Sequence, residues 1–211
     1  MICDIHTHRH PNEPGRAIVQ LMPEDFHLFG GHFYSVGLHP WSINDNWRLQ
    51  MAELLVKALH PQVVMIGEAG IDKKNGAASI EVQMDVFREH VRLSELVRKP
   101  LIVHCVKGVD EILAVRNELK ATLPWVIHGF RGGVEQWRQL SRAGVYVSIG
   151  VHHNQSLIEE IPLSQLLIES DELGCLEDVY DLVSAAKHIG KKELEQYVAT
   201  NVYDLLTACR R

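Results

Sequence analysis

Eight short apolar runs separated by amphipathic stretches constrain the fold of this chain more than any other feature. The runs cover residues 2–7, 17–21, 33–39, 63–68, 101–105, 125–130, 145–150 and 166–170. Most are rich in Val and Ile, which favour β-strands, and runs that are apolar nearly throughout suit parallel strands covered on both faces. The intervening stretches repeat apolar residues every three or four positions, as amphipathic helices do. They cover about 44–60, 79–98, 108–121, 133–143, 176–188 and 191–208.

This alternation of strands and helices predicts a (β/α)8 TIM barrel. The early connections are short, because only eight residues separate His8 from Ala17 and a crossover helix needs more. We therefore expect the first βα units to be trimmed or distorted, unless the run 17–21 is not a barrel strand. A doubly wound open sheet is the alternative. The 211 residues contain no obvious linker, so the sequence predicts a single domain, 1–211.

The composition excludes several classes of protein. With 46% hydrophobic and 23% charged residues, the chain is neither disordered nor fibrous. No apolar run reaches the ~18 residues of a membrane span, and the start MICDIHTHRH lacks the pattern of a signal peptide. We therefore expect a cytoplasmic protein without a membrane span, and the sequence indicates no obligate protein partner. The net charge of -6 gives no general field that would attract nucleic acid.

The polar residues that close the apolar runs are the main functional signal. The chain has 13 His and 27 acidic residues, and several of them stand at the ends of the runs. In a parallel barrel the carboxyl ends of all strands share one face, where active sites lie. We therefore expect these side chains to converge. They are Asp4, His6, His8, His39, Glu68, His104, His128, Glu169 and Asp171.

Each of these residues has a simpler explanation when it is taken alone. His6 and His8 could be surface histidines, Glu68 could form an ion pair with a neighbouring strand, and Asp171 could cap the next helix. The later histidines could be hydrogen-bonded core residues. Their common position at strand ends favours a shared function instead. Four histidines and two acids suffice for two divalent ions with a bridging carboxylate, an arrangement that performs hydrolysis and phosphoryl transfer.

The segments that carry these residues resemble the TatD family of metal-dependent hydrolases, in the amidohydrolase superfamily. The matching segments are DIHTH, VGLHPW, VVMIGEAGID, PLIVHC, VIHGFRGG and LLIESD, in the order of the family. Gln83 and Phe87 fit the family's QxxxF spacing, and Asn201 fits an Asn of its last helix. The PHP phosphoesterases also open with an HxH strand, but GEAGID and HGFRG favour TatD.

The resemblance implies two divalent metal ions, Zn, Mg or Mn, and a hydrolytic reaction. The implied metal ligands are His6, His8, Glu68, His104, His128 and Asp171. The first two histidines and Asp171 would hold one ion, the other two histidines would hold the second, and Glu68 would bridge both. Asp171 and Glu68 would be catalytic, and Asp171 would orient or deprotonate the attacking water. Many members are described as DNases, often exonucleases, which implies DNA or a small phosphodiester as substrate.

Three residues are candidates for contact with the phosphate or leaving group of the substrate. His39 would lie near the phosphate or leaving group, or it is a structural His before Pro40. The family usually has an Arg soon after the His of the fifth strand, whereas this chain reads HCVKG there and later HGFRG. We therefore expect the phosphate-contacting cation at Lys107 or Arg131, unless both are solvated surface charges. Trp41 and Trp47 could stack on a base, although such residues more often pack a loop over a barrel.

The loop after Asp171 departs from the family. No Pro follows this residue, and the long loop usually found there is reduced to LGCLED, residues 173–178. A site trimmed in this way should be more open or built for a different substrate. Two alternatives therefore stay open: a hydrolase of the same fold acting on small amides, lactones or phosphomonoesters, and a non-catalytic nucleic-acid-binding relative.

Overall fold

The eight strands form one parallel sheet in which neighbours follow the order of the chain. The computed structural model describes residues 1–172 and 174–209, so Leu173, in the shortened loop, lies outside the described residues. The strands are β1 (Asp4–Thr7), β2 (Ala17–Leu21), β3 (Phe33–Val36), β4 (Val63–Asp72), β5 (Leu101–Val106), β6 (Trp125–Ile127), β7 (Val145–Ile149) and β8 (Leu167–Ile168). All eight predicted runs therefore contain a strand.

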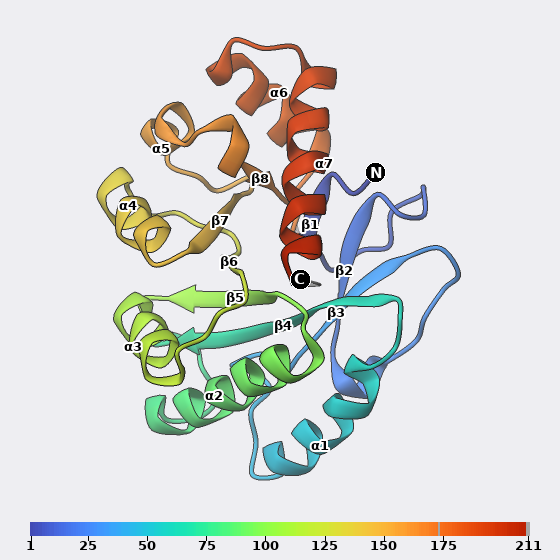
Figure 1. Cartoon of the computed structure of the whole chain (residues 1–211), viewed down its shortest axis with the longest axis vertical. Helices are drawn as coiled ribbons and strands as arrows, with labels where there is room; N and C mark the ends of the chain where they lie inside the picture. The colour runs from blue at the N-terminus through green and yellow to red at the C-terminus, as the bar shows by residue number, and fades with distance from the viewer. Residues whose placement is uncertain (173, 210–211) are drawn as a thin grey trace.

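The sheet closes on itself between its first and last strands. A parallel bridge joins Thr7 to Asp171, and the Asp171 N–H donates to the His6 carbonyl over 3.1 Å. The sheet is thus a nearly closed barrel, which confirms the (β/α)8 prediction, and the alternative of a doubly wound open sheet is wrong. Figure 1 shows β1 lying between β2 and β8, with helices around the outside.

The helices confirm all six predicted stretches and add one more. They are α1 (Trp47–Ala58), α2 (Ile80–Val97), α3 (Val109–Leu119), α4 (Val134–Arg142), α5 (Gln155–Glu160), α6 (Leu176–Lys187) and α7 (Lys191–Ala208), with short 3-10 helices η1 (Pro23–Asp25) and η2 (Leu163–Gln165). The helix that was not predicted, α5, is too short to show a clear period. In the described part of the chain, no helix is both long enough and apolar enough to cross a membrane.

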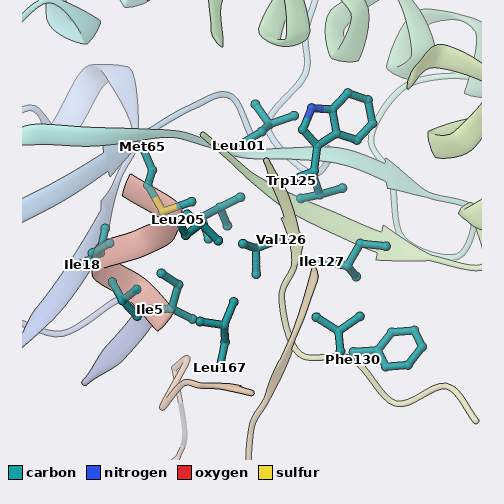
Figure 2. Close-up of a cluster of buried hydrophobic side chains, with 14 of the residues drawn as sticks. Ile5, Ile18, Met65, Leu101, Trp125, Val126, Ile127, Phe130, Leu167 and Leu205 are labelled. Carbon is teal, nitrogen blue, oxygen red and sulfur yellow. The ribbon is translucent and has the colours of Figure 1, made fainter. Parts of the chain in front are cut away.

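The first two βα units are trimmed, as expected. Residues 8–16 are all described and contain no helix, and residues 22–32 contain only η1. The run 17–21 is nevertheless a barrel strand that pairs with both β1 and β3. Figure 2 shows Ile5 and Ile18 from these early strands in one buried cluster with Met65 and with Leu205 of α7. The last helix therefore contributes to the core beneath the trimmed units.

Strand β4 extends further than the sequence analysis placed it. We expected the run to end at Glu68, but the strand continues to Asp72 and its register against β5 shifts between Ile66 and Ala69. Gly67 is required at this irregularity, because its φ is 116° and a Cβ there would lie 2.2 Å from the carbonyl oxygen of Ile102. Glu68 thus lies inside an irregular strand, where its charge is compensated by histidines from other elements.

Gln83 and Asn201, two residues that match the TatD pattern, form hydrogen bonds between helices and the barrel. The buried Gln83 side chain accepts a hydrogen bond from the Asp72 N–H over 2.8 Å and donates to the Asp72 carbonyl over 3.2 Å, which fixes the end of β4. Asn201 donates to the carbonyls of Leu163 and Leu166, over 2.7 and 2.9 Å. This residue ties α7 to the chain that leads into β8.

A buried histidine on α2 fixes the loop that follows β3. The Leu38 N–H donates to His90 Nε2 over 2.9 Å, while His90 Nδ1 donates to the Val86 carbonyl over 2.8 Å. The ring is fully buried, and burial lowers the pKa of His90 to about 4. His90 therefore stays neutral in the folded protein and holds the backbone immediately before His39.

This burial predicts a specific loss of stability in acid. Below pH 6.5 the unfolded chain protonates His90 while the folded chain does not, so the free energy of unfolding should fall by about 3 kcal/mol as the pH drops to about 4. His90→Gln should lose that much less over the same range. Urea unfolding of both proteins without metal, at several pH values, measures the difference. Parallel stability curves for the two proteins would contradict the assignment.

Candidate metal centre

The six predicted ligands meet at the carboxyl-terminal mouth of the barrel, with the Glu68 carboxylate at their centre. Glu68 comes from β4 and is 2% exposed. The others come from or directly follow the carboxyl ends of β1, β5, β6 and β8; they are His6, His8, His104, His128 and Asp171. The structure therefore brings together residues that are up to 165 positions apart in the sequence, His6 and Asp171.

One oxygen of Glu68 faces the histidines of the first strand. Oε2 lies 3.3 Å from His6 Nε2 and 3.5 Å from His8 Nε2. Asp171 Oδ1 lies 3.7 Å from His6 Nε2 and 3.6 Å from His8 Nε2. The two imidazole nitrogens and the Glu68 oxygen thus lie within 4.8 Å of one another, as ligands of one cation do.

The other oxygen of Glu68 faces a different set of histidines. Oε1 lies 2.6 Å from His128 Nε2, 2.7 Å from His104 Nδ1 and 3.1 Å from His39 Nε2. His39 Nε2 is also 3.1 Å from His104 Nδ1. The sequence suggested His39 as a substrate contact, but here its ring nitrogen is placed like those of the predicted ligands.

The charges in the centre stabilise one another. Burial alone would raise the pKa of Glu68, but the adjacent His128 charge and hydrogen bonds from His104 and His128 hold it well below its usual range. Burial likewise opposes the charged form of His128, yet Glu68 and Glu169 raise its pKa well above the usual value. Glu68 and His128 therefore each favour the charged form of the other.

The residues fit a divalent metal ion. His6 is fully buried, and among the described residues neither of its ring nitrogens has a hydrogen-bond partner. A buried polar atom left in this way needs a compensating ligand, and Nε2 points to two carboxylate oxygens. Neutral imidazole with carboxylate is a donor set that suits several divalent metals. Three groups hold their ligand atoms within 4.8 Å of one another: His6–His8–Glu68, His6–His128–Asp171 and His39–Glu68–His104.

Asp171 is oriented by the barrel and does not cap a helix. Helix α6 begins at Leu176 with Cys175 at its N-cap position, so the simpler explanation of Asp171 is wrong. Thr7 Oγ1 donates to the Asp171 carbonyl over 3.2 Å, and the residue has a φ of 53°. Its side chain is 36% exposed. Asp171 can therefore contact both the histidines and a substrate.

Buried polar residues below the ligands, which the sequence analysis overlooked, fix Glu68. The Gln20 side-chain oxygen accepts hydrogen bonds from the Glu68 N–H over 2.6 Å and from Ser35 Oγ over 2.7 Å. These two polar residues interrupt the apolar runs AIVQL and FYSV, and that interruption is the signal that could have found them. They link β2, β3 and β4 at the level of the site.

Asp72 is a further site residue that the sequence analysis did not single out. It is 1% exposed, and its Oδ2 lies 3.3 Å from His104 Nε2. Burial would raise its pKa, but hydrogen bonds from Trp41 and from the backbone N–H groups of Asn75 and Lys74 lower it. Asp72 therefore faces the ring nitrogen of His104 that points away from Glu68. The signal in the sequence is an acid closing the run AGID.

Glu169 has the same relation to His128. The residue is fully buried, and Ser148 Oγ donates to its Oε2 over 2.5 Å. Its Oε1 lies 3.7 Å from His128 Nδ1, and neither atom has a hydrogen-bond partner among the described residues. Metal-binding histidines usually donate their second N–H to such a carboxylate. Glu169 is thus placed to keep the proton on Nδ1 and leave Nε2 free for a metal.

A cavity of about 840 Å³ opens beside the centre. Asp171, His104 and His128 line its floor, and the two candidate cations Lys107 and Arg131 line its walls. Both cations are exposed, and neither has an ion-pair partner within residues 1–172 and 174–209. The structure therefore places Lys107 and Arg131 together on one cavity beside the centre. His39 is not among the residues that line this cavity, and it belongs instead to one of the groups that could hold a metal ion.

The fold and the site together define a class: a parallel α/β barrel with a histidine–carboxylate centre at its carboxyl-terminal mouth. The family model described as TatD related DNase matches residues 16–207. This match spans most of the chain, and the chain belongs to that family.

Individual relatives agree with this assignment. An uncharacterised metal-dependent hydrolase from Buchnera aphidicola is 29% identical over 160 residues, which cover 69% of this chain and 61% of the relative. The 3'-5' ssDNA/RNA exonuclease TatD of Citrobacter rodentium is 28% identical over 148 residues, covering 65% of this chain and 56% of that protein. The chain thus spans about three fifths of the length of the curated relatives it matches.

Solved structures confirm the fold. The crystal structure of YJJV, a TatD homologue of Escherichia coli K12, superimposes with a TM-score of 0.77 at 22% identity, covering 90% of this chain and 86% of YJJV. A TatD family hydrolase from Entamoeba histolytica gives a TM-score of 0.75 at 18% identity, covering 90% of this chain and 83% of that one.

The contact between Glu169 and His128 predicts how metal binding responds to substitution. Glu169→Ala should weaken the affinity for Zn²⁺ about 10- to 100-fold, because His128 loses the carboxylate that faces its Nδ1. Glu169→Gln should lose less, because its amide oxygen still faces Nδ1. Calorimetric titration of metal-stripped protein measures both, and Glu159→Ala, at an exposed carboxylate on α5, is the matched control. A folded Glu169→Ala protein with the affinity of the parent would contradict this role.

Proposed function

We propose that this chain is a divalent-metal-dependent hydrolase that cleaves phosphodiester bonds of nucleic acid. The observation that carries the proposal is the division of the Glu68 carboxylate, whose two oxygens face two separate sets of histidines. A bridging carboxylate of this kind belongs to sites that hold two metal ions. The description of the family as DNases and the exonuclease named among the relatives support the choice of bond.

The ligand set divides naturally between two ions, which we propose to be Zn, Mg or Mn. His6, His8 and Asp171 would hold the first ion, and Glu68 would bridge to the second. His104 and His128 would hold the second ion, and His39 lies where it could join them or contact the phosphate. Divalent ions held there would acidify a water molecule and offset the charge that builds on phosphoryl oxygens.

The protein's own groups then orient the substrate and move the proton. Asp171 reaches both the first pair of histidines and the cavity, so its carboxylate can accept the proton of the attacking water and pass it to the leaving oxygen. Lys107 and Arg131 would hold phosphates on the cavity wall. Because the net charge of the chain is -6, this attraction must be local.

Two other functions of the same fold make different predictions. Glu172 also lines the cavity, next to Asp171, and its charge would favour a smaller or less anionic substrate such as an amide, a lactone or a phosphomonoester. A non-catalytic nucleic-acid-binding relative would keep Lys107 and Arg131 on the cavity but would not need Asp171. A panel of end-labelled single-stranded DNA, a phosphomonoester and an amide separates these functions from the one we propose.

Replacing Asp171 tests the proposed chemistry. Chelator-treated protein should be inactive on single-stranded DNA and should recover with Zn²⁺, Mg²⁺ or Mn²⁺. Asp171→Asn should lower turnover by about 10²- to 10⁴-fold, because the water loses its proton acceptor while the shape of the side chain is kept. Glu172→Gln, a neighbouring carboxylate on the same cavity, is the matched control and should retain activity. Full turnover by metal-free protein, or by Asp171→Asn, would refute the mechanism.

A further inference from the structure

One tryptophan of this chain is exposed, and it lies beside the metal centre. Trp41 is 53% exposed, whereas the three other tryptophans are between 0% and 9% exposed: Trp47, Trp125 and Trp137. A residue whose role is to pack a loop over a barrel would bury its ring, as those three do. Trp41 therefore leaves a large apolar face in contact with solvent at the mouth of the site.

The exposed ring is held in a fixed position. Its Nε1–H donates to Asp72 Oδ2 over 2.6 Å, and its backbone N–H donates to His39 Nδ1 over 3.1 Å. Asp72 is itself buried and held by the backbone N–H groups of Lys74 and Asn75, each over 2.8 Å. The indole is thus anchored along its polar edge, and this anchoring leaves a face of the ring exposed without making the side chain mobile.

The position of the ring relates it directly to the reacting groups. The indole lies edge-on to His39, with ring centroids 4.9 Å apart, and 6.0 Å from the ring of His104. It lines the same cavity as Lys107 and Arg131. These three features of one cavity match the three parts of a nucleotide chain. The flat apolar ring matches a base, the candidate metal centre matches the scissile phosphate, and the two cations match the neighbouring phosphates.

We propose that Trp41 is a stacking platform for a nucleobase of the substrate, next to the phosphate held at the metal centre. This inference rests on the proposed function and narrows it to substrates that carry bases, since a simple phosphodiester would make no use of the ring. Stacking is tolerant of sequence, because every base presents a π-face. The platform therefore selects single-stranded ends, whose bases are free to unstack, without selecting a sequence.

Binding measurements that need no catalysis test this inference. The Asp171→Asn protein, loaded with Mn²⁺, is titrated with fluorescently labelled dT4 and with an abasic oligomer of the same length and charge. Adding Trp41→Ala should weaken dT4 binding at least about fivefold and leave the abasic oligomer unchanged. Trp41→Phe, which keeps a ring but loses the N–H, should bind dT4 nearly as the parent does. Lys107→Ala should weaken both oligomers alike, since it removes a phosphate contact.

Two results would overturn the platform. One is equal affinity of the Asp171→Asn parent for dT4 and for the abasic oligomer, and the other is an equal loss for both when Trp41→Ala is added. Failure of the proposed function looks different. If the protein cleaves no phosphodiester but binds dT4 through Trp41, the stacking platform stands and the proposed hydrolase function is wrong. If it cleaves DNA but gives either of the two results above, the hydrolase function stands and the platform is wrong.

Discussion

The burial of one carboxylate among histidines organises this molecule. Glu68 is almost completely enclosed, and an isolated buried charge would cost several kcal/mol. Its two oxygens are compensated from β1 on one side and from β5, β6 and the loop after β3 on the other, so the ligands can meet only if the barrel closes. Gly67 permits the irregular backbone at this point, and Gln20 holds the Glu68 N–H. The formation of the site therefore depends on the closure of the barrel.

The chain keeps a full set of barrel strands although its first two connections contain no α-helix. The ligands stand at or just after the carboxyl ends of strands or, for Glu68, inside one. Shortening the early connections therefore leaves the ligands in place. Their orientation is completed by buried carboxylates that face the outer nitrogens of the rings, Asp72 for His104 and Glu169 for His128. Asp72 lies within hydrogen-bond distance of His104, at 3.3 Å, whereas Glu169 lies 3.7 Å from His128.

Much of this could be predicted from the sequence. Apolar runs alternating with amphipathic stretches predicted the eight strands and six of the seven α-helices found in residues 1–172 and 174–209. Polar residues closing those runs predicted that the six candidate ligands converge. Residues that act through distant partners could not be predicted in this way. In the sequence, Gln20 is a single polar residue in an apolar strand, and only the fold shows that it binds the Glu68 N–H. The role of Trp41 likewise depends on its exposure and on its hydrogen bond to Asp72, which only the structure gives. The end of β4 is not predictable from the run itself, because Glu68 is a buried acid inside the strand and the strand continues to Asp72.

Anomalous diffraction from crystals soaked in Zn²⁺ would show whether the Glu68 carboxylate bridges two cations. We expect two peaks about 3.5–4 Å apart, one on each side of the Glu68 carboxylate. Each peak should lie about 2.0–2.2 Å from a different Glu68 oxygen, the first beside His6 and His8 and the second beside His104 and His128. A single ion, or ions bound without Glu68, would contradict this account of the centre.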